Sequence, residues 1–333
     1  MSAVVELKNL KKYFDVKEGQ LHAVDDITMS FEEGTTMGVV GESGCGKSTL
    51  ARTIIHLYEP TSGQIIYKGR DVTHVSRKDL PKLRQEMQII FQDPYMTLNP
   101  RYTVEDTLKE PLILSGKYEP ASLDKQLSKI MDMVGISGRL RMAYPHELSG
   151  GRRQRVGIGR ALAMNPKFIV CDEPVSALDV SIQAQIINLL QDLQKEYGLT
   201  YMFVTHDMSV VRHISHNISV MYLGQLVETS PTKDLFKIAL HPYSKALLSA
   251  IPSVDIDRPR KKIALKGELV SPINPKPGCR FAPRCPYACE ACSKPQILRE
   301  LLPNHYIACC RAEELNREAL AANQENVNGI LLK

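Results

Sequence analysis

A glycine-rich stretch, Gly41-Glu-Ser-Gly-Cys-Gly-Lys-Ser48, carries the residue types that bind phosphate. It fits the pattern G-x-x-x-x-G-K-[ST], in which the backbone amides of a tight turn point at an anion. Lys47 is placed to reach the outer phosphates, and Ser48 can put its hydroxyl on Mg²⁺. The stretch therefore predicts a site for a nucleoside triphosphate with magnesium. The candidate nucleotide-binding residues are Gly41, Ser43, Gly44, Cys45, Gly46, Lys47, Ser48 and Thr49.

The segments on either side of this loop are those that a phosphate site needs. Residues 36–40, Thr-Met-Gly-Val-Val, are apolar on both faces, as a central parallel strand is. A helix is expected to begin at Ser48, and its positive end then faces the same phosphates. A chance match of a glycine-rich turn is the alternative, but a strand before and a helix after the loop argue against it.

Polar residues follow further predicted strands. Residues 167–171 form a buried strand with Asp172 and Glu173 at its carboxyl end, where open α/β sheets bind ligands. Asp172 can hold Mg²⁺ through water, and Glu173 can polarise the attacking water. His206 follows the strand 200–204 and is a candidate sensor of the γ-phosphate.

Two more side chains are weaker candidates. Gln92 follows the strand 87–91 and can reach a metal or water beside the phosphates. Tyr13 can stack on an adenine ring, although one aromatic residue near an N-terminus is as often part of the core. Neither residue alone is evidence for a nucleotide site.

The segment Ser149-Gly-Gly151 precedes a helix expected from Arg152 to Met164. Arg152, Arg153 and Arg155 stand at the helix start, where cations oppose the helix dipole. An anion docked on the amides of Ser149, Gly150 and Gly151 would remove this conflict. A solvated basic helix after a glycine turn is the alternative.

The rest of the chain predicts mixed α and β structure. Residues 3–8 and 27–31 are expected to be strands of a small antiparallel sheet, joined by a polar connection over 15–22. Residues 103–147 indicate a mostly helical insertion, and 218–222 with 226–229 indicate a closing hairpin.

Composition bounds the class of protein. The 333 residues suffice for about two domains. A formal net charge of +5 is too small to indicate nucleic acid as a partner. No apolar run approaches the roughly 18 residues that span a bilayer, and the N-terminus lacks the layout of a signal peptide. We therefore expect a cytosolic protein that meets a membrane only through a partner.

Six of the eight cysteines fall between Cys279 and Cys310. In a reducing cytosol such a group indicates a metal before a disulfide. Four thiolates can hold zinc or an iron–sulfur cluster, and the pair Cys289-x-x-Cys292 favours zinc. Free buried thiols are the third alternative.

Taken in order, the motifs resemble those of an ABC-transporter ATPase. They are GESGCGKST (41–49), the Gln92 loop, LSGGR (148–152), IVCDEP (169–174), SALD (176–179) and His206. A second set looks like the dipeptide/oligopeptide importer ATPases in particular. It comprises FQDPYMTLNP (91–100), EPVSALDV (173–180), HPYSKALL (241–248) and PGCRFAPRCPY (277–287).

The resemblance implies an α/β fold, the ABC cassette of the P-loop NTPases. Such a cassette has a mixed central sheet, an antiparallel β subdomain and a helical subdomain, here at about 93–158. It divides the chain into a nucleotide-binding domain, 1–235, and a C-terminal extension, 236–333, with its cysteines at 279–310.

The resemblance also implies an ATP-hydrolysing subunit of an importer of di- and oligopeptides. Two cassettes would pair head to tail, with ATP between the P-loop of one and Ser149–Arg152 of the other. Asp179 would lie in the D-loop, and Glu173, His206 and Gln92 would serve catalysis. The implied magnesium ligands are Ser48, Gln92 and Asp172.

The implied partners are two transmembrane permease subunits, a second and non-identical ABC ATPase, and indirectly an extracytoplasmic binding protein. The subunit would be peripheral, on the cytoplasmic face of the cell membrane, with the Gln92 loop and the helical insertion docked on the permeases. Arg152 departs from the glutamine usual at that place, while Ser149 and both glycines remain. A changed side chain there can tune closure or accompany an unlike partner.

Proteins similar to this chain hold a [4Fe–4S] cluster on the cysteines that match Cys279, Cys285, Cys292 and Cys309. Cys289 and Cys310 would then be extra thiols. Other cargoes of similar importers are nickel, opines and oligosaccharides, between which the sequence does not choose. A soluble ABC ATPase of translation or DNA repair is the rival class, but such proteins usually carry two fused cassettes or a long coiled-coil insert, and this sequence shows neither.

Overall fold

The computed structural model describes residues 2–251, 263–265, 267 and 271–321. The chain forms two compact units, each built from separate stretches. The first comprises Met1–Leu10, Thr28–Met37 and Ser48–Thr205, and the second comprises Lys11–Ile27, Gly38–Lys47 and His206–Lys333. The units do not coincide with the predicted domains 1–235 and 236–333, whose boundary remains a prediction.

A small antiparallel sheet begins the chain, and residues 11–27 of its first two strands and their turn belong to the second unit. Its strands are β1 (Ala3–Val16), β2 (Gly19–Glu32), β4 (Ser62–Tyr67) and β5 (Arg70–Asp71), in the order β2-β1-β4-β5. Buried Met29 and Phe31 alternate with exposed Thr28 and Ser30, so one face of the strand packs on the core.

The prediction of the first two strands was right in kind but wrong in extent. The expected polar connection over 15–22 is mostly strand, and only residues 17–18 form the turn. Polar side chains are compatible with these strand ends because the ends are half-exposed and need no apolar alternation.

Three short parallel strands form the centre of the first unit. They are β6 (Met87–Ile90), β7 (Phe168–Asp172) and β8 (Thr200–Thr205). β7 pairs with both others, with Cys171 opposite Ile90 and Asp172 opposite Val204. Every residue of β7 and β8 is buried, as in strands covered on both faces. The predicted strand 36–40 is confirmed as β3 (Thr36–Val40), within which the chain passes from the first unit to the second.

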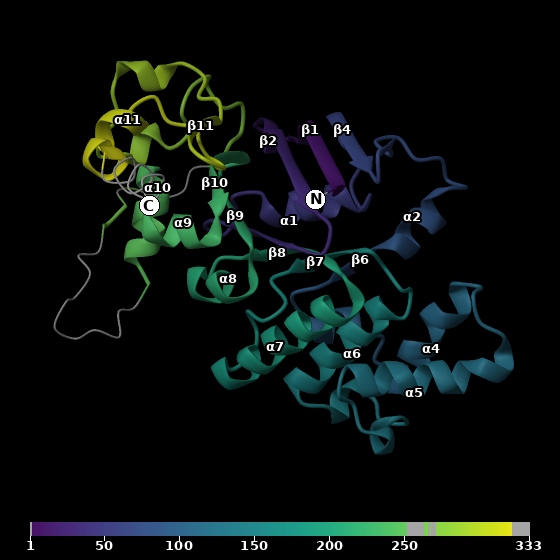
Figure 1. The fold of residues 1–333 in the computed structure, drawn as a ribbon. Helices are drawn as coiled ribbons and strands as arrows, with labels where there is room; N and C mark the ends of the chain where they lie inside the picture. The colour runs from purple at the N-terminus through teal and green to yellow at the C-terminus, as the bar shows by residue number, and fades with distance from the viewer. Residues whose placement is uncertain (1, 252–262, 266, 268–270, 322–333) are drawn as a thin grey trace, which may run out of the picture. The chain divides into compact units, whose positions relative to one another are not determined.

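Helices α4 (Val104–Leu114), α5 (Leu123–Met133) and α7 (Val180–Tyr197) of the first unit lie around α6 (Gly150–Leu162), as Figure 1 shows. The predicted helical insertion is confirmed by α4 and α5. α6 begins two residues before the expected Arg152, because Ser149 already has the extended backbone of an N-cap. α7 ends at Gly198, whose φ of 63° suits glycine. The shorter helices are α1 (Lys47–Ile54), α2 (Leu80–Glu86) and α3 (Pro94–Thr97).

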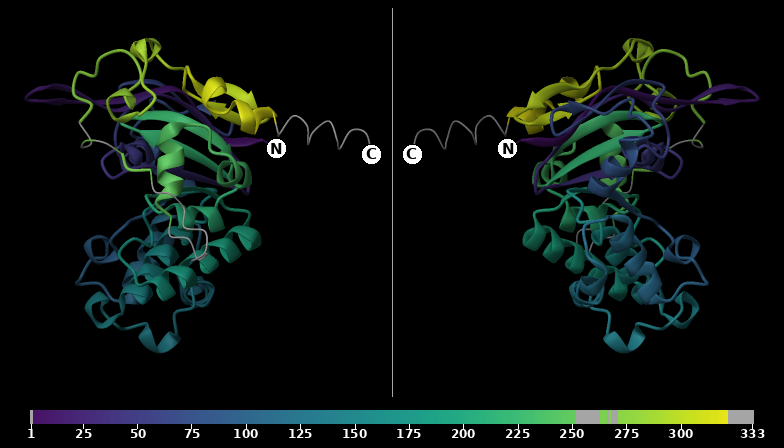
Figure 2. Two further views of the ribbon diagram at one scale, coloured as in Figure 1. Left: turned by 90° about the vertical axis from the view of Figure 1, so that its left-hand side faces the viewer. Right: turned by 90° about the vertical axis from the view of Figure 1, so that its right-hand side faces the viewer.

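The second unit contains the predicted hairpin, confirmed as β9 (Asn217–Tyr222) and β10 (Gln225–Pro231). Two C-terminal strands extend it in the antiparallel order β9-β10-β12-β11, and Figure 2 shows them beside the hairpin. These are β11 (Arg299–Leu302) and β12 (His305–Ile307). Buried His305 and Glu228 join β12 to β10 through a 2.6 Å contact.

Helices α8 (Met208–Ile214), α9 (Thr232–Lys237), α10 (Pro242–Ser249) and α11 (Ala312–Leu315) complete the second unit. Its main core contains three fully buried aromatic rings, those of Tyr222, Tyr243 and Phe281. In the part of the chain that the structure describes, no helix has the length and apolar character to cross a membrane.

Candidate functional site

The glycine-rich loop of the second unit closes around the ammonium group of Lys47. This side chain is buried, and its Nζ donates to the carbonyl oxygens of Gly41 at 2.8 Å and Glu42 at 2.9 Å. Gly46 has a φ of 104°, and a Cβ there would lie 2.0 Å from the carbonyl oxygen of Ala23. Only glycine fits this close approach, so the loop requires the residue types that the motif names.

The side chains of the loop face different surroundings. Ser43 and Gly44 are exposed, whereas Cys45 is fully buried. Burial raises the pKa of the Cys45 thiol, so this thiol stays protonated at neutral pH. Cys45 can therefore contribute its backbone to a nucleotide, while its side chain belongs to the core.

Two of the three expected magnesium ligands, Ser48 and Asp172, lie together in the first unit. Ser48, at the start of α1, donates from Oγ to Asp172 Oδ1 at 2.6 Å. Asp172 is buried at the end of β7, and Arg52 Nη2 lies 3.5 Å from its other carboxylate oxygen. A hydroxyl and a carboxylate are oxygen ligands of the kind that Mg²⁺ prefers.

Glu173, the next residue, has an unusual backbone. Its φ is 49°, the left-handed region, which costs a non-glycine residue about 1–2 kcal/mol. Two backbone bonds hold it there: its amide donates to the Val204 carbonyl at 3.0 Å, and its carbonyl accepts from the Ser176 amide at 3.3 Å. Strain of this kind gathers at functional sites, and sequence reasoning missed it because no residue pattern signals a positive φ at glutamate.

Gln92 and Glu173 come from neighbouring strands and meet. Gln92 follows β6 and donates from Nε2 to Glu173 Oε2 at 3.1 Å. Parallel pairing of β6 with β7 brings the two strand ends to one edge of the sheet. Both expected catalytic residues of the first unit are therefore within hydrogen-bond reach of each other.

Ser149 is the N-cap of α6, and its hydroxyl makes no capping bond. The neighbouring arginines have partners other than an anion. Arg153 Nε donates to the Pro145 carbonyl at 2.6 Å, and Arg155 Nη1 donates to the Val134 carbonyl, at the end of α5, at 2.8 Å. Arg153 and Arg155 therefore need no anion at the helix start, and the prediction of one there rests on the exposed Arg152.

Tyr13, in the second unit, is a fixed aromatic platform. Its ring stacks on that of His22, with centroids 3.8 Å apart and planes 18° from parallel. Its hydroxyl donates to Asp25, and burial together with this hydrogen bond raises the pKa of Tyr13. Of the other predicted residues, His206 is exposed in the second unit, while Thr49 is half-buried in α1 and Asp179 is the exposed N-cap of α7.

The four predicted cluster ligands line one small cavity of the second unit. These are Cys279, Cys285, Cys292 and Cys309. In a cubane cluster each thiolate binds a different iron, so the ligands surround a space and need not touch.

A second cysteine arrangement shares Cys292. The sulfurs of Cys289, Cys292 and Cys310 all lie within 4.8 Å of one another, with Cys292 at 3.9 Å and 3.8 Å from the other two. Zinc–sulfur bonds of about 2.3 Å at a tetrahedral centre place sulfurs about 3.8 Å apart. This triad therefore fits three corners of a site for one ion, and the expectation that Cys289 and Cys310 are mere extras does not follow from the geometry.

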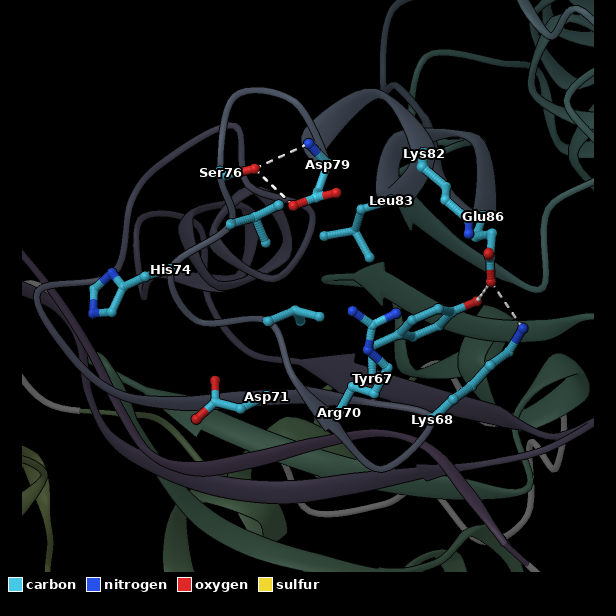
Figure 3. A pocket seen from close by; sticks show the side chains of 12 residues that line it. Tyr67, Lys68, Arg70, Asp71, His74, Ser76, Asp79, Lys82, Leu83 and Glu86 are labelled. Atoms are coloured by element: carbon cyan, nitrogen blue, oxygen red, sulfur yellow. Dashed lines mark hydrogen bonds and ion pairs between the residues drawn. The ribbon is translucent and has the colours of Figure 1, made fainter.

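The first unit also has a polar pocket, which Figure 3 shows from close by. The residues that line it come from β4, β5, α2 and the segments that connect them, and include none of the predicted site residues. Several of its charges are matched internally, as Figure 3 shows: Lys68 Nζ and the Tyr67 hydroxyl each lie 2.9 Å from Glu86 Oε2.

Comparison with known proteins agrees with these observations. Residues 24–176 match the ABC transporter family, and residues 227–292 match the family described as oligopeptide/dipeptide transporter, C-terminal region. One solved structure, a dimeric post-hydrolysis state of the ATP-binding cassette MJ0796 bound to ADP and Pi, is 31% identical. It has a TM-score of 0.62 and covers 68% of this chain and 98% of that one. The predicted α/β P-loop fold of an ABC cassette is thus confirmed.

Two relatives match nearly end to end. The oligopeptide transport ATP-binding protein AppF of Bacillus subtilis (strain 168) is 48% identical over 319 residues, which are 92% of this chain and 96% of AppF. The oligopeptide transport ATP-binding protein OppF of Salmonella typhimurium (strain LT2) is 46% identical over 324 residues, 94% and 97% of the two chains. With the phosphate loop and the strand-end carboxylates in place, the chain belongs to the ATP-binding subunits of the oligopeptide/dipeptide ABC transporters, and it is an ATPase.

Proposed function

We propose that Glu173 is the general base of this ATPase and that hydrolysis powers the import of di- and oligopeptides. The observation that supports the assignment most is the local geometry of Glu173. The carboxylate directly follows the buried Asp172, its backbone is held at a φ of 49°, and Gln92 bonds it at 3.1 Å. A carboxylate of fixed direction beside metal ligands can accept a proton from an attacking water.

The other residues have supporting roles in this proposal. Bound magnesium neutralises charge on the phosphates. Ser48, Asp172 and Gln92 would hold it, while Lys47 exchanges its loop carbonyls for phosphate oxygens. Glu173 takes the proton of the water whose oxygen bonds to the γ-phosphorus, as the bond to the β–γ bridging oxygen breaks.

Two residues of the second unit would recognise the ends of the nucleotide. Tyr13 would stack on the adenine ring, supported by the fixed orientation that His22 and Asp25 impose on it. His206 would sense the γ-phosphate, since it directly follows the last residue of a parallel strand.

The site is proposed to be completed by a facing cassette. Ser149, Gly150 and Gly151 would donate to the γ-phosphate from the start of α6, and the dimeric cassette with ADP and Pi supports such pairing. Asp179 would contact the facing subunit as the D-loop residue. Arg152 is exposed and would tune this contact in place of glutamine.

The names of the relatives, both oligopeptide transport ATP-binding proteins, support peptide as the cargo. The proposed partners are two permease subunits, a second and non-identical ABC ATPase, and a binding protein acting through the permeases. The helical subdomain, 93–158, would dock on the permeases from the cytoplasmic face of the membrane. The C-terminal extension would begin near residue 236.

The function is tested by assembling the subunit with its cognate permeases and second ATPase in lipid vesicles. We expect ATP hydrolysis and peptide uptake to rise together when peptide-loaded binding protein is added, and both to stop with Glu173→Gln. Nickel, an opine and an oligosaccharide serve as competing cargoes. If one of these and not peptide stimulates ATP hydrolysis, peptide is not the cargo. Full ATPase activity of the isolated subunit would favour a soluble ABC ATPase.

For the cysteines we propose a [4Fe–4S] cluster on Cys279, Cys285, Cys292 and Cys309. Its support is the cavity that all four line. The cluster would join the segment 279–292 to the segment after β12, and so stabilise a region built of short elements.

Anaerobic purification tests the cluster against the thiol triad. Iron and sulfide in near-equal amounts are expected, lost in Cys285→Ser and kept in the matched exposed-thiol variant Cys289→Ser. Stoichiometric zinc that is lost in Cys289→Ser and kept in Cys285→Ser would assign the metal to the triad instead.

A further inference from the structure

The segment between two of the proposed cluster ligands, Cys279-Arg-Phe-Ala-Pro-Arg-Cys285, is fixed at its centre. Phe281 is 1% exposed and packs edge-on against Tyr222, with ring centroids 5.2 Å apart, and obliquely against Tyr243 at 5.4 Å. A short 3₁₀ turn over Ala282–Arg284 follows it. The backbone on either side of Phe281 is therefore held in place, and each side carries one arginine.

Arg284 reaches the phosphate-binding loop. Its Nη1 donates to Glu42 Oε2 at 2.7 Å, and the two side chains are 11% and 26% exposed. The same glutamate is bound through its backbone, because its amide donates to the Tyr243 hydroxyl at 2.8 Å and its carbonyl accepts from Lys47. Glu42 thus connects Arg284 to Lys47, the lysine that is proposed to bind phosphate oxygens.

Arg280 reaches the proposed adenine platform. It donates to the Asp25 carboxylate and to the Leu223 carbonyl, and its side chain is only 7% exposed. Asp25 in turn accepts the hydroxyl of Tyr13. The half-buried Asp25 carboxylate, bonded to both Arg280 and Tyr13, leaves the Tyr13 ring little freedom. Removing the guanidinium would take away the permanent positive charge beside that carboxylate.

We propose that Arg280 and Arg284 are positioning residues of the ATP site, supplied by the cysteine-containing C-terminal region. Arg280 orients Tyr13 for the adenine ring, and Arg284 holds the phosphate loop through Glu42. The inference rests on the proposed binding of adenine by Tyr13 and of phosphates by the loop. It gives the C-terminal region a part in nucleotide binding, because each arginine is covalently next to a proposed cluster ligand.

The test uses the full chain, purified without air, and two probes with magnesium. One is AMP-PNP, a non-hydrolysable ATP analogue, and the other is tripolyphosphate, which lacks the adenosine. Dissociation constants are measured by calorimetry for the parent, Arg280→Ala and Arg284→Ala. The matched control is Arg299→Ala, which removes an arginine of the same region that is paired with Glu313.

Arg284→Ala should raise the dissociation constants of both probes about five- to twentyfold. Arg280→Ala should raise the dissociation constant of AMP-PNP alone, by a similar factor. Adding Glu42→Gln to Arg284→Ala should cause little further loss, since the pair acts as one unit. Arg284→Lys, which keeps the charge, should recover part of the affinity even if Arg284→Ala lowers the melting temperature.

The outcomes separate the inference from the proposed function. Equal affinities in the parent and both arginine variants would overturn the inference and leave the proposed function standing. An equal loss of affinity for both probes in Arg280→Ala would do the same. A parent chain that binds neither probe would overturn the proposed nucleotide site and the inference with it.

Discussion

Replacing Glu173 with glutamine separates the charge of the proposed base from the shape of its side chain. A glutamine oxygen can still accept the hydrogen bond from Gln92 that is 3.1 Å long in the structure. The backbone at φ 49° is set by Val204 and Ser176, and glutamine meets the same left-handed strain as glutamate. We therefore expect the free energy of unfolding to change by less than about 0.5 kcal/mol.

The loss should fall on the chemical step. A positioned general base contributes about 10²–10⁴-fold, which is about 2.7–5.4 kcal/mol of activation free energy. The assay is phosphate release by the assembled transporter at saturating ATP, together with AMP-PNP binding, which should be unchanged. Glu196→Gln, an exposed substitution on α7, is the matched control. Turnover within a few-fold of the parent would refute the assignment of Glu173.

The backbone strain adds an internal check on the same position. Glycine relieves the left-handed strain of about 1–2 kcal/mol and alanine does not. Glu173→Gly should therefore unfold at higher urea than Glu173→Ala, although both lack the base and neither should hydrolyse ATP. The reverse order of stabilities would show that the positive φ is not a strained feature of the folded chain.

Three further changes test other parts of the structure. Gly46→Ala should abolish AMP-PNP binding in calorimetry, since its Cβ would lie 2.0 Å from the Ala23 carbonyl oxygen, whereas Gly138→Ala, which meets nothing within 4 Å, should bind as the parent does. Phe281→Ala should lower the free energy of unfolding in urea by about 3–5 kcal/mol, because the ring is fully buried, and an unchanged value would contradict its role as an anchor. Ser149→Ala should leave the melting temperature unchanged, because its hydroxyl caps no amide, yet slow the assembled transporter; equal activity would exclude a contact with the facing nucleotide.

Where the sequence carries a local signal, the prediction of secondary structure was accurate. The strand predicted over 36–40 matched β3 to the residue, and the predicted helical insertion over 103–147 contains α4 and α5. The length of the N-terminal hairpin was underestimated because the ends of β1 and β2 near the turn are half-exposed and carry no apolar alternation. Composition alone makes such a segment look like a loop.

Contacts between distant residues could not be predicted from the sequence in the same way. The first turn of α6 looked over-charged, but Arg155 reaches the end of α5 at Val134, 21 residues earlier. The approach of Cys310 to Cys292 likewise depends on the turns between them, and sequence spacing did not suggest it. Each is a tertiary contact, set by how helices and turns pack and not by local propensity.

The division of the chain into compact units suggests why the C-terminal region bears on nucleotide binding. The phosphate loop up to Lys47 belongs to the second unit together with residues 206–333, whereas Ser48, Asp172 and Glu173 belong to the first. The proposed phosphate loop up to Lys47 and the proposed general base therefore belong to different units, and the chain passes from one to the other between Lys47 and Ser48. A perturbation of the C-terminal region reaches Lys47 through Glu42, before any group proposed to act on water. Changes at the cysteines should accordingly alter nucleotide affinity more than the rate of the chemical step, a difference that Kd and single-turnover measurements on Cys285→Ser would separate.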